Sequence, residues 1–309
     1  MYKILIADTI TASAIELLQS NNKYKIDIKN GLSEQELLKQ IPEYHAIIVR
    51  SATKISSAVL DVAENLKVIG RAGSGLDNID VPYAKKKGIA VFNTPGSNSQ
   101  AVAELTISFI LILLRNLYHA IDSLKNKQWN KSEFLGIEIK GKTVGLIGFG
   151  QIGQKVGKMA AGLGMRILVY KRQPLLRSPG FEFEMTDLDK VLTKSDIVSL
   201  HLPKTEQTSQ LFGLNELRQM KSSAYLINCA RGGIVNEKDL LYALDNEIIA
   251  AAALDVFERE PPASYALIDH PKVVATPHIG GATVESQERV GLDIVHIVMD
   301  YLETKYVFI

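Results

Sequence analysis

The sequence predicts an α/β protein made of two doubly wound parallel-sheet domains with a cleft between them. Short runs rich in Ile, Leu and Val alternate with segments of helix length. Continuous apolar runs of this kind are typical of parallel strands that are covered on both faces. The chain has 309 residues, and a typical domain has about 100–200 residues, so the length also favours two domains.

The expected strands fall into two series along the chain. The first series consists of Lys3–Ala7, Ala46–Val49, Val68–Arg71 and Ala90–Asn93. The second series consists of Thr143–Ile147, Arg166–Tyr170, Ile197–Leu200, Ala224–Asn228, Ala250–Leu254 and Val273–Ala275. Alternation of strands and helices within each series predicts right-handed βαβ units.

A long helix is expected between the two series. It begins near Ser97, where Ser97 or Asn98 can act as the N-cap, and it continues through the apolar run Ala101–Leu114. That run is shorter than the about 20 residues that a membrane span needs. We therefore expect it to be buried in protein, within this chain or against a partner subunit.

A second long helix, Thr283–Tyr301, follows the second series. We expect it to pack back on the first series, which makes the first domain discontinuous. The predicted domains are a substrate-binding domain of residues 1–96 plus 283–309 and a dinucleotide-binding domain of residues 97–282. The polar segment Asn126–Gly141 is expected to be a loop, with Trp129 as its one large anchor.

Charge and cysteine content narrow the class of protein. The 35 basic and 34 acidic residues nearly cancel, so nothing favours nucleic acid or an anionic membrane as a partner. The single cysteine, Cys229, excludes an intrachain disulfide and a zinc site built on several thiolates. The N-terminus lacks the apolar core of a signal peptide. We expect a cytoplasmic protein without a metal, a nucleic-acid partner or a membrane partner.

A glycine motif follows the first strand of the second series. Residues 143–153 read TVGLIGFGQIG, in which Gly148, Gly150 and Gly153 form G-x-G-x-x-G between a strand and a helix. These glycines permit a tight turn, the approach of a pyrophosphate to the backbone, and close contact of helix and strand. The N–H groups that begin the helix can bind the phosphates. The motif predicts a dinucleotide site in a Rossmann-type domain.

The residue expected to select the cofactor departs from the usual pattern. An acidic residue about 20 positions after the motif commonly binds the ribose 2′-hydroxyl of NAD. Here Lys171 and Arg172 follow the strand Arg166–Tyr170. The two cations could hold the 2′-phosphate of NADP, or both could point to solvent while other groups hold NAD. We expect NAD as the cofactor, with NADP as the alternative.

Three polar motifs follow strands of the second series: NCARGG at 228–233, LDVFEREPP at 254–262 and TPHIGG at 276–281. Carboxyl ends of parallel strands form the edge of the sheet at which ligands bind. His278 suits a base that removes a hydroxyl proton. Glu260 could orient that base, although Glu258 competes for the role. Arg231 offers two parallel donors to a substrate carboxylate.

Seven segments carry a resemblance to a known family: VRSATKI at 49–55, GRAGSGLDNID at 70–80, NTPGSNSQAVAEL at 93–105, KQWNKSEFLGIEIKGKTVGLIGFGQIG at 127–153, NCARGGIVNE at 228–237, AALDVFEREPP at 252–262 and PHIGGAT at 277–283. With these segments the chain resembles the D-2-hydroxyacid dehydrogenases over nearly its whole length. The resemblance implies two Rossmann/flavodoxin-like domains and a homodimer formed through the region of the helix near Ser97.

The resemblance also implies the oxidation of a small D-2-hydroxy acid by a nicotinamide cofactor. Arg231, Glu260 and His278 would be the catalytic residues, since the family pattern D-x-F-x-x-E-P selects Glu260 over Glu258. Further cofactor contacts are implied for Ser74, Gln151, Ile152, Cys229, Ala230, Asp255 and Gly280. From the sequence alone, Cys229 reads only as a small buried residue.

A phosphorylated acid, 3-phosphoglycerate, is the leading substrate that the resemblance implies. Its phosphate needs cations besides Arg231, and the matching segments offer Arg50, Arg71 and Lys131. Lys131 replaces an Arg that is usual in this segment of relatives acting on this acid. The other implied substrate contacts are Ser74, Gly75 and Asn98. Alternatively, the two arginines form structural ion pairs and Lys131 is solvated.

Two other functions stay open at this point. Reduction of glyoxylate or hydroxypyruvate uses the same chemistry, and KRQP at 171–174 resembles NADP-using reductases of that kind. Relatives of this fold also act as dinucleotide-sensing corepressors without turnover. Because the chain ends soon after the last predicted helix, we expect no C-terminal regulatory domain such as longer relatives carry.

Overall fold

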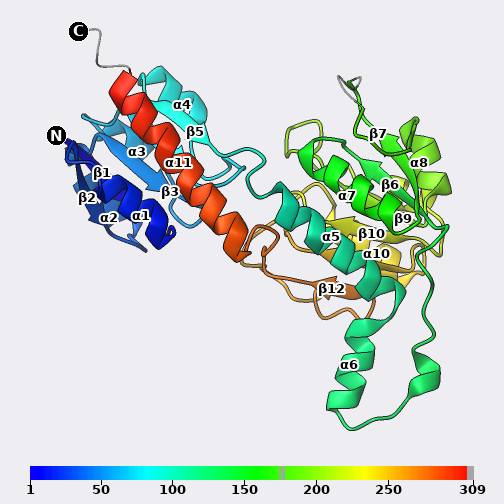
Figure 1. Ribbon diagram of the computed structural model, residues 1–309. Helices are drawn as coiled ribbons and strands as arrows, with labels where there is room; N and C mark the ends of the chain where they lie inside the picture. The colour runs from blue at the N-terminus through cyan, green and yellow to red at the C-terminus, as the bar shows by residue number, and fades with distance from the viewer. Residues whose placement is uncertain (174, 176–177, 305–309) are drawn as a thin grey trace. The chain divides into compact units, whose positions relative to one another are not determined.

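The computed structural model describes residues 1–173, 175 and 178–304 and contains two compact units (Figure 1). Unit 1 comprises Met1–Asn98 and the segment that begins at Gly281, and unit 2 comprises Ser99–Gly280. The domain boundaries predicted from the sequence, 96/97 and 282/283, each lie two residues from the boundaries between these units. Residues 305–309 of the predicted first domain lie outside the described residues. The roles predicted for the two domains remain predictions.

Unit 1 contains a five-stranded parallel sheet in the order β2-β1-β3-β4-β5. Its strands are β1 (Tyr2–Ile6), β2 (Tyr24–Ile28), β3 (Ala46–Val49), β4 (Val68–Arg71) and β5 (Ala90–Asn93). Its helices are α1 (Ala12–Gln19), α2 (Glu34–Gln40), the 3₁₀ helix η1 (Ile41–Glu43), α3 (Ser57–Asp61), α4 (Val81–Lys86) and α11 (Val284–Thr304). This strand order is that of the flavodoxin-like doubly wound fold.

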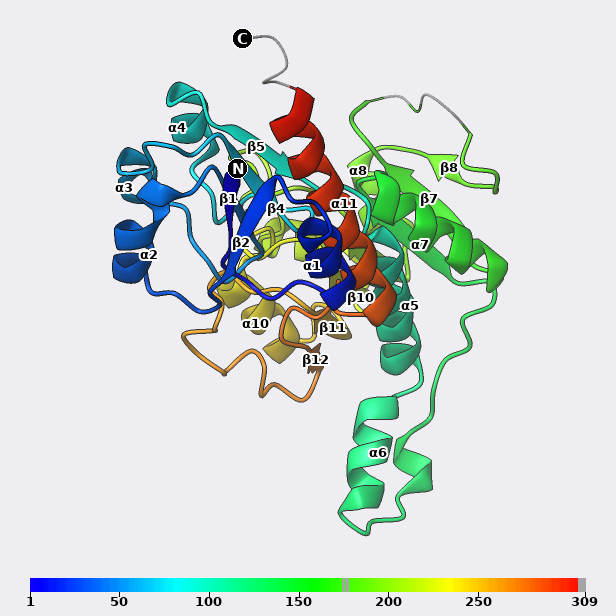
Figure 2. The same ribbon diagram turned by 60° about the vertical axis from the view of Figure 1, so that its left-hand side comes forward.

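Helices cover both faces of this sheet. Helices α1 and α11 lie side by side in both views (Figure 2), and Leu18 and Val298 pack with Ile4 and Ile6 in one buried cluster. A second cluster contains Leu37, Val59 and Ala84 from α2, α3 and α4. The predicted return of the last helix to the first series is therefore confirmed.

Unit 2 contains a seven-stranded parallel sheet in the order β12-β11-β10-β9-β6-β7-β8. Its strands are β6 (Thr143–Ile147), β7 (Arg166–Tyr170), β8 (Glu184–Met185), β9 (Ile197–Leu200), β10 (Tyr225–Asn228), β11 (Ala251–Leu254) and β12 (Val273–Ala275). Its helices are α5 (Ser99–Leu114), α6 (Leu117–Lys125), the 3₁₀ helix η2 (Lys131–Glu133), α7 (Gln151–Gly162), α8 (Leu188–Lys194), α9 (Leu214–Gln219) and α10 (Glu237–Asp245).

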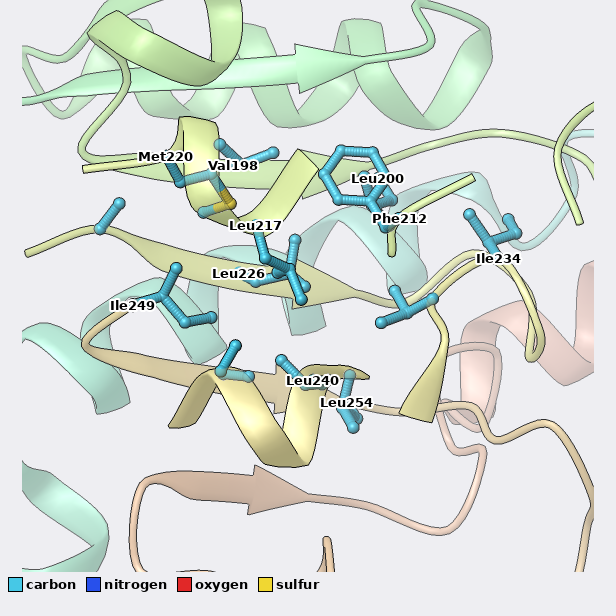
Figure 3. Packing of buried hydrophobic residues seen from close by; sticks show 14 of the residues in the cluster. Val198, Leu200, Phe212, Leu217, Met220, Leu226, Ile234, Leu240, Ile249 and Leu254 are labelled. Carbon is cyan, nitrogen blue, oxygen red and sulfur yellow. The ribbon is translucent and has the colours of Figure 1, made fainter. Parts of the chain in front are cut away.

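The core of unit 2 has two layers on the two faces of the sheet. On one face, Val198, Leu226 and Leu254 of the sheet pack against Leu217 of α9 and Leu240 of α10 (Figure 3). On the other, residues of α5 and α7 pack in a separate cluster. Strand order reverses between β6 and β9, and such a switch point creates the opening in which dinucleotides bind.

Strands β3 and β6 have the bounds predicted from their continuous apolar runs. Both strands are buried at every position, which explains why every residue in them is suited to a buried site. The sequence did not reveal β2, whose residues alternate between apolar and polar, or the two-residue β8. Strand β1 begins at Tyr2 and not at the predicted Lys3, because Tyr2 pairs with Tyr24 of β2.

Helix α6 extends away from the seven-stranded sheet in both views (Figure 1, Figure 2). The prediction that Trp129 anchors the following segment is wrong, because 82% of the residue is exposed. Among the described residues, no single helix has the length and apolarity to cross a membrane. The bent pair α5 and α6, with 67° between its helices, meets that test by length and composition only.

Candidate active site

The glycine motif forms the turn between β6 and α7. Gly148 has a positive φ of 92°, and a Cβ there would lie 2.3 Å from the carbonyl oxygen of His201. A Cβ on Gly153 would lie 2.6 Å from the carbonyl oxygen of Gly148. A side chain at either position would therefore displace the backbone. The space around the Cβ position of Gly150 is open to 4 Å, which leaves room for a pyrophosphate beside the turn.

The first turn of α7 is suited to an anion. Gly150 is its N-cap, and no side-chain hydrogen bond from the described residues caps this end. Gln151, Ile152 and Gly153 begin the helix, so their N–H groups lie at its partially positive end. The open glycine turn and this helix end together fit a dinucleotide pyrophosphate.

Strand β7 ends beside the glycine turn, as the Tyr170 carbonyl accepts a hydrogen bond from Gly148 N–H at 2.9 Å. The next residues are the half-buried Lys171 and the exposed Arg172. Arg172 donates from Nη1 to Gln207 Oε1 at 2.6 Å, so its guanidinium is held by a neutral side chain. Both cations follow directly on the end of β7, and a contact of either with a cofactor phosphate stays a prediction.

Asp255 organises the segment that carries His278. Its carboxylate is fully buried at the end of β11. Oδ1 accepts hydrogen bonds from Thr276 Oγ1 at 2.6 Å and Ile279 N–H at 2.7 Å. Oδ2 accepts one from Gly280 N–H at 2.8 Å. These three bonds fix the backbone on both sides of His278, which has a positive φ of 53°. Non-glycine residues adopt such a conformation at a cost, and often do so at functional sites.

His278 and Glu260 form a direct pair. Nδ1 of His278 lies 2.6 Å from Oε2 of Glu260, and the two side chains are 47% and 37% exposed. The hydrogen bond to Glu260 raises the pKa of His278, although partial burial opposes it. Burial acts to raise the pKa of Glu260, but the bonds from His278 and Phe257 N–H bring it below its usual value. The pair therefore favours a charged imidazole beside a charged carboxylate.

Arg231 follows β10 and acts electrostatically on both members of this pair. Its Nη1 donates to the Ala230 carbonyl at 2.7 Å. Asn228 fixes the turn, since its side chain donates to the Arg231 carbonyl at 3.0 Å and accepts from Ala230 N–H at 3.0 Å. The structure thus brings the three predicted catalytic residues together within unit 2.

Cys229 lies in the same turn and is 6% exposed. Burial raises the pKa of its thiol to about 12. A thiol in this state is not a nucleophile at neutral pH, which agrees with the expectation of a small buried residue.

Arg50 follows β3 in unit 1, and its segment is held by Asp8. The Asp8 carboxylate accepts hydrogen bonds from Arg50 N–H at 2.5 Å and from Thr53 N–H and Oγ1 at 3.2 and 2.8 Å. Asn78 Nδ2 donates to the carbonyls of Arg50 and Thr53. The Arg50 guanidinium contacts the Thr9 carbonyl at 3.3 Å, and among the described residues no acid forms an ion pair with it.

Ser74 and Asn98 contact each other in unit 1, with Ser74 Oγ donating to Asn98 Oδ1 at 2.8 Å. Gly75 beside them is buried. Nη1 of Arg71 donates to the carbonyl of the next residue, Ala72, at 3.5 Å. Lys131 is exposed in η2 of unit 2. Contacts of all these residues with a substrate stay a prediction.

Sequence reasoning missed the residues that hold the site in place. Asp8 and Asn78 act through backbone groups of the Arg50 segment. His201 supplies the carbonyl beneath Gly148, and burial lowers the pKa of its side chain to about 4. Asp8 and His201 come just after apolar strand runs, which is the sequence signal that could have found them, whereas Asn78 lies in a loop and has no such signal.

Residues 107–280 match the family model described as D-isomer specific 2-hydroxyacid dehydrogenase, NAD binding domain. The chain is 39% identical over 305 residues to the D-3-phosphoglycerate dehydrogenase of Synechocystis sp., covering 98% of this chain and 54% of the relative. It is 42% identical over 297 residues to the hydroxypyruvate reductase of Thermotoga maritima, covering 95% of this chain and 96% of the relative.

A solved structure of D-lactate dehydrogenase from Aquifex aeolicus, complexed with NAD and lactic acid, has a TM-score of 0.87 and 29% identity, covering 97% of this chain and 95% of that one. The chain spans a little over half the length of the first D-3-phosphoglycerate dehydrogenases that it matches. Unit 2 contains the family's NAD-binding domain, and the chain belongs to the D-isomer specific 2-hydroxyacid dehydrogenases.

Proposed function

We propose that this chain is a D-3-phosphoglycerate dehydrogenase that oxidises 3-phosphoglycerate to 3-phosphohydroxypyruvate with NAD. The observation that carries the reaction class is the His278–Glu260 pair beside Arg231. The relatives named D-3-phosphoglycerate dehydrogenase, at 39–42% identity, support this substrate.

His278 acts as the general base in this proposal. Its Nδ1 is engaged by Glu260 at 2.6 Å, so the neutral ring carries a proton on Nδ1 and leaves Nε2 to accept the proton of the C2 hydroxyl. Glu260 stabilises the imidazolium that forms, as a carboxylate does in other base–carboxylate pairs. In the opposite direction, the same imidazolium returns the proton to the C2 oxygen.

Arg231 binds and orients the acid. A guanidinium can donate two parallel hydrogen bonds to a carboxylate, and its charge stabilises negative charge that develops on the C2 oxygen. Ser74, Gly75 and Asn98 contribute further substrate contacts, and Ser74 also contacts the cofactor. Gly148, Gly150, Gln151, Ile152 and Gly153 would hold the pyrophosphate of NAD, whose nicotinamide would supply the acceptor for the hydride that leaves C2. Cys229, Ala230, Asp255 and Gly280 complete its contacts near the reacting carbon.

Recognition of the substrate phosphate is assigned to Arg50, Arg71 and Lys131. Support for Arg50 comes from its charge and from the firmly held backbone of its segment. The deciding experiment compares kcat/KM for 3-phosphohydroxypyruvate and hydroxypyruvate as reducible substrates. Strong preference for the phosphorylated acid is expected, and equal use of both acids would reject this substrate.

Hydroxypyruvate or glyoxylate reduction is the second candidate. Its support is the Thermotoga maritima relative, which this chain matches over 96% of its length at 42% identity. A lysine at position 131, which lacks the two parallel donors of Arg, also weakens the case for a phosphate site. The same comparison of acids decides between the two functions.

We also propose that the chain forms a homodimer through the region of α5 and α6. Seven large apolar residues of α6 and the segment after it are exposed: Leu117, Tyr118, Ile121, Leu124, Trp129, Leu135 and Ile137. A group of exposed apolar side chains of this size is typical of an interface. Sedimentation equilibrium should give twice the mass of the chain, and Ile121→Asp should shift it toward the monomer.

A further inference from the structure

Two carboxylates outside the catalytic residues bind each other's backbone. Glu237, the first residue of α10, accepts a hydrogen bond at Oε1 from Glu258 N–H at 2.5 Å. Glu258 in turn accepts one at Oε1 from Glu237 N–H at 3.2 Å. The result is a reciprocal pair that joins the start of α10 to the segment after β11.

The joined segments are those that carry the proposed catalytic groups. Arg231 lies in the turn between β10 and α10, and Glu260 lies two residues beyond Glu258. The two segments also touch directly, because a Cβ on Gly232 would lie 1.7 Å from the Phe257 carbonyl oxygen. Glu260 itself is held at its other oxygen by Phe257 N–H at 3.1 Å. The position of Glu260 therefore depends on the backbone of residues 257–260.

From this geometry we propose that Glu237 is a positioning residue: it holds the backbone of residues 257–260 so that Glu260 meets His278. The inference rests on the proposed function, in which that pair accepts the substrate proton. Glu237 acts through the backbone N–H of Glu258 and needs no contact with substrate or cofactor.

Capping of helix α10 does not explain the position of the Glu237 side chain. Asn236 already caps α10, as its side chain accepts hydrogen bonds from Lys238 N–H and Asp239 N–H, both at 3.1 Å. Burial, and the charges of Glu258 and Glu260, raise the pKa of Glu237, while the hydrogen bond from Glu258 opposes that rise. Burial and the neighbouring acids thus disfavour the charged form of Glu237. The hydrogen bond from the Glu258 N–H compensates for part of this cost.

Two variants distinguish the length of the Glu237 side chain from its charge. Glu237→Asp keeps the charge and the helix, but it is one methylene too short to reach Glu258 N–H. Glu237→Gln keeps the reach and an acceptor oxygen, but it removes the charge. We expect Glu237→Asp to lower kcat about tenfold, since displacement of a catalytic group by about 1 Å can cost up to a hundredfold. Glu237→Gln should keep most of the wild-type kcat.

A second readout does not depend on turnover. NMR titration of the His278 imidazole should show its pKa falling toward the ordinary value in Glu237→Asp, because Glu260 is less firmly held beside it. The titration in Glu237→Gln should stay closer to that of the wild type. The other charged groups that act on His278 are Asp255 and Arg231, and neither variant changes them.

Glu216→Asp is the matched control. Glu216 also lies in the first turn of a helix of unit 2 and accepts a backbone N–H, that of Gly213 at 3.1 Å. Its shortening should leave kcat and the His278 titration unchanged. If both Glu237 variants match the wild type, or if Gln lowers kcat as much as Asp does, the proposal is overturned. If the wild type does not oxidise 3-phosphoglycerate, the proposed function fails, and the His278 titration still decides the role of Glu237.

Discussion

Nδ1 of His278 lies 2.6 Å from Oε2 of Glu260, and in the proposed reaction this pairing determines which ring nitrogen exchanges a proton with the substrate. Only Nε2 remains for that purpose. The left-handed backbone conformation of His278 is held by the hydrogen bonds that Asp255 accepts from Thr276, Ile279 and Gly280. The proposed base His278, its partner Glu260 and the backbone bonds to Asp255 therefore depend on one another, and a separate substitution tests each of them.

His278→Asn should lower turnover by orders of magnitude while leaving dinucleotide binding intact. Asn cannot accept a proton at the C2 hydroxyl, whereas the residues assigned to the pyrophosphate, Gly148 to Gly153, are untouched. Removal of a general base costs about 10²- to 10⁴-fold in kcat. NADH titration followed by fluorescence, together with steady-state rates, measures both effects. Turnover near that of the wild type would contradict the assignment of His278.

Glu260→Gln should move the pH dependence of oxidation to lower pH. The base must be neutral to accept a proton, so the oxidation rate rises with pH through the pKa of His278. The hydrogen bond to Glu260 raises that pKa above its ordinary value, and its loss lets the pKa fall. For reduction of the keto acid, the imidazole must be charged, so that rate falls as pH rises through the same pKa. Profiles of kcat in both directions test the sign, and unmoved profiles would mean that Glu260 is not coupled to the base.

Asp255→Asn should destabilise unit 2 and disturb His278 together. Asn keeps one acceptor oxygen, but its amide meets the Gly280 N–H, which leaves two donors facing each other in a buried place. Loss of a hydrogen bond to a buried carboxylate costs about 2 kcal/mol, which corresponds to a fall in Tm of about 4–8 °C for a unit of this size. Thr276→Val, which removes only the hydroxyl bond to Oδ1, should cost about half as much. Calorimetry of both variants gives the comparison.

The sequence predicted the parts of the fold that depend on continuous apolar runs and on glycine. Strand β6 and the turn at Gly148 are examples, because burial on both faces and a positive φ each restrict the residue types. The alternating strand β2 was missed, since its polar positions resemble a surface segment. Trp129 was misjudged because nothing in a sequence distinguishes an aromatic anchor from an exposed aromatic residue.

For the proposed site, the sequence pointed to residues whose chemistry is distinctive, such as His278 and Arg231, and their catalytic roles stay predictions. It could not identify the residues that hold them. The bond of Glu237 to a backbone N–H of another segment depends on the tertiary packing of two loops, and any acceptor of suitable length would serve. Asp8 acts on the backbone of Arg50 in the same way.

Lys171→Asp should move cofactor preference toward NAD(H). The change removes a cation that can bind the 2′-phosphate of NADP, and it supplies an acceptor for the ribose hydroxyl of NAD. We expect measurable NADP(H) activity in the wild type and an increase of about tenfold or more in the ratio of NAD to NADP kcat/KM in the variant, as each lost charged hydrogen bond is worth about 1.5–3 kcal/mol. Lys194→Asp, at the exposed end of α8 in the same unit, controls for the change in net charge. A wild type without NADP(H) activity would show that Lys171 and Arg172 do not bind the 2′-phosphate of NADP.

Arg50→Ala should weaken the preference for a phosphorylated acid without disturbing the segment that carries it. Asp8 binds the backbone N–H of residue 50 and Asn78 binds its carbonyl, and neither bond needs the guanidinium. Loss of one charged contact to the phosphate should lower kcat/KM for 3-phosphohydroxypyruvate by about 10- to 100-fold, with little change for hydroxypyruvate. Added salt should reduce the wild-type preference in the same direction, since it screens exposed charges. Lys54→Ala removes an exposed cation from the same segment and should change neither rate. An equal fall for both acids would instead place Arg50 at the carboxylate or in the structure of unit 1, and it would leave phosphate recognition to Arg71 and Lys131.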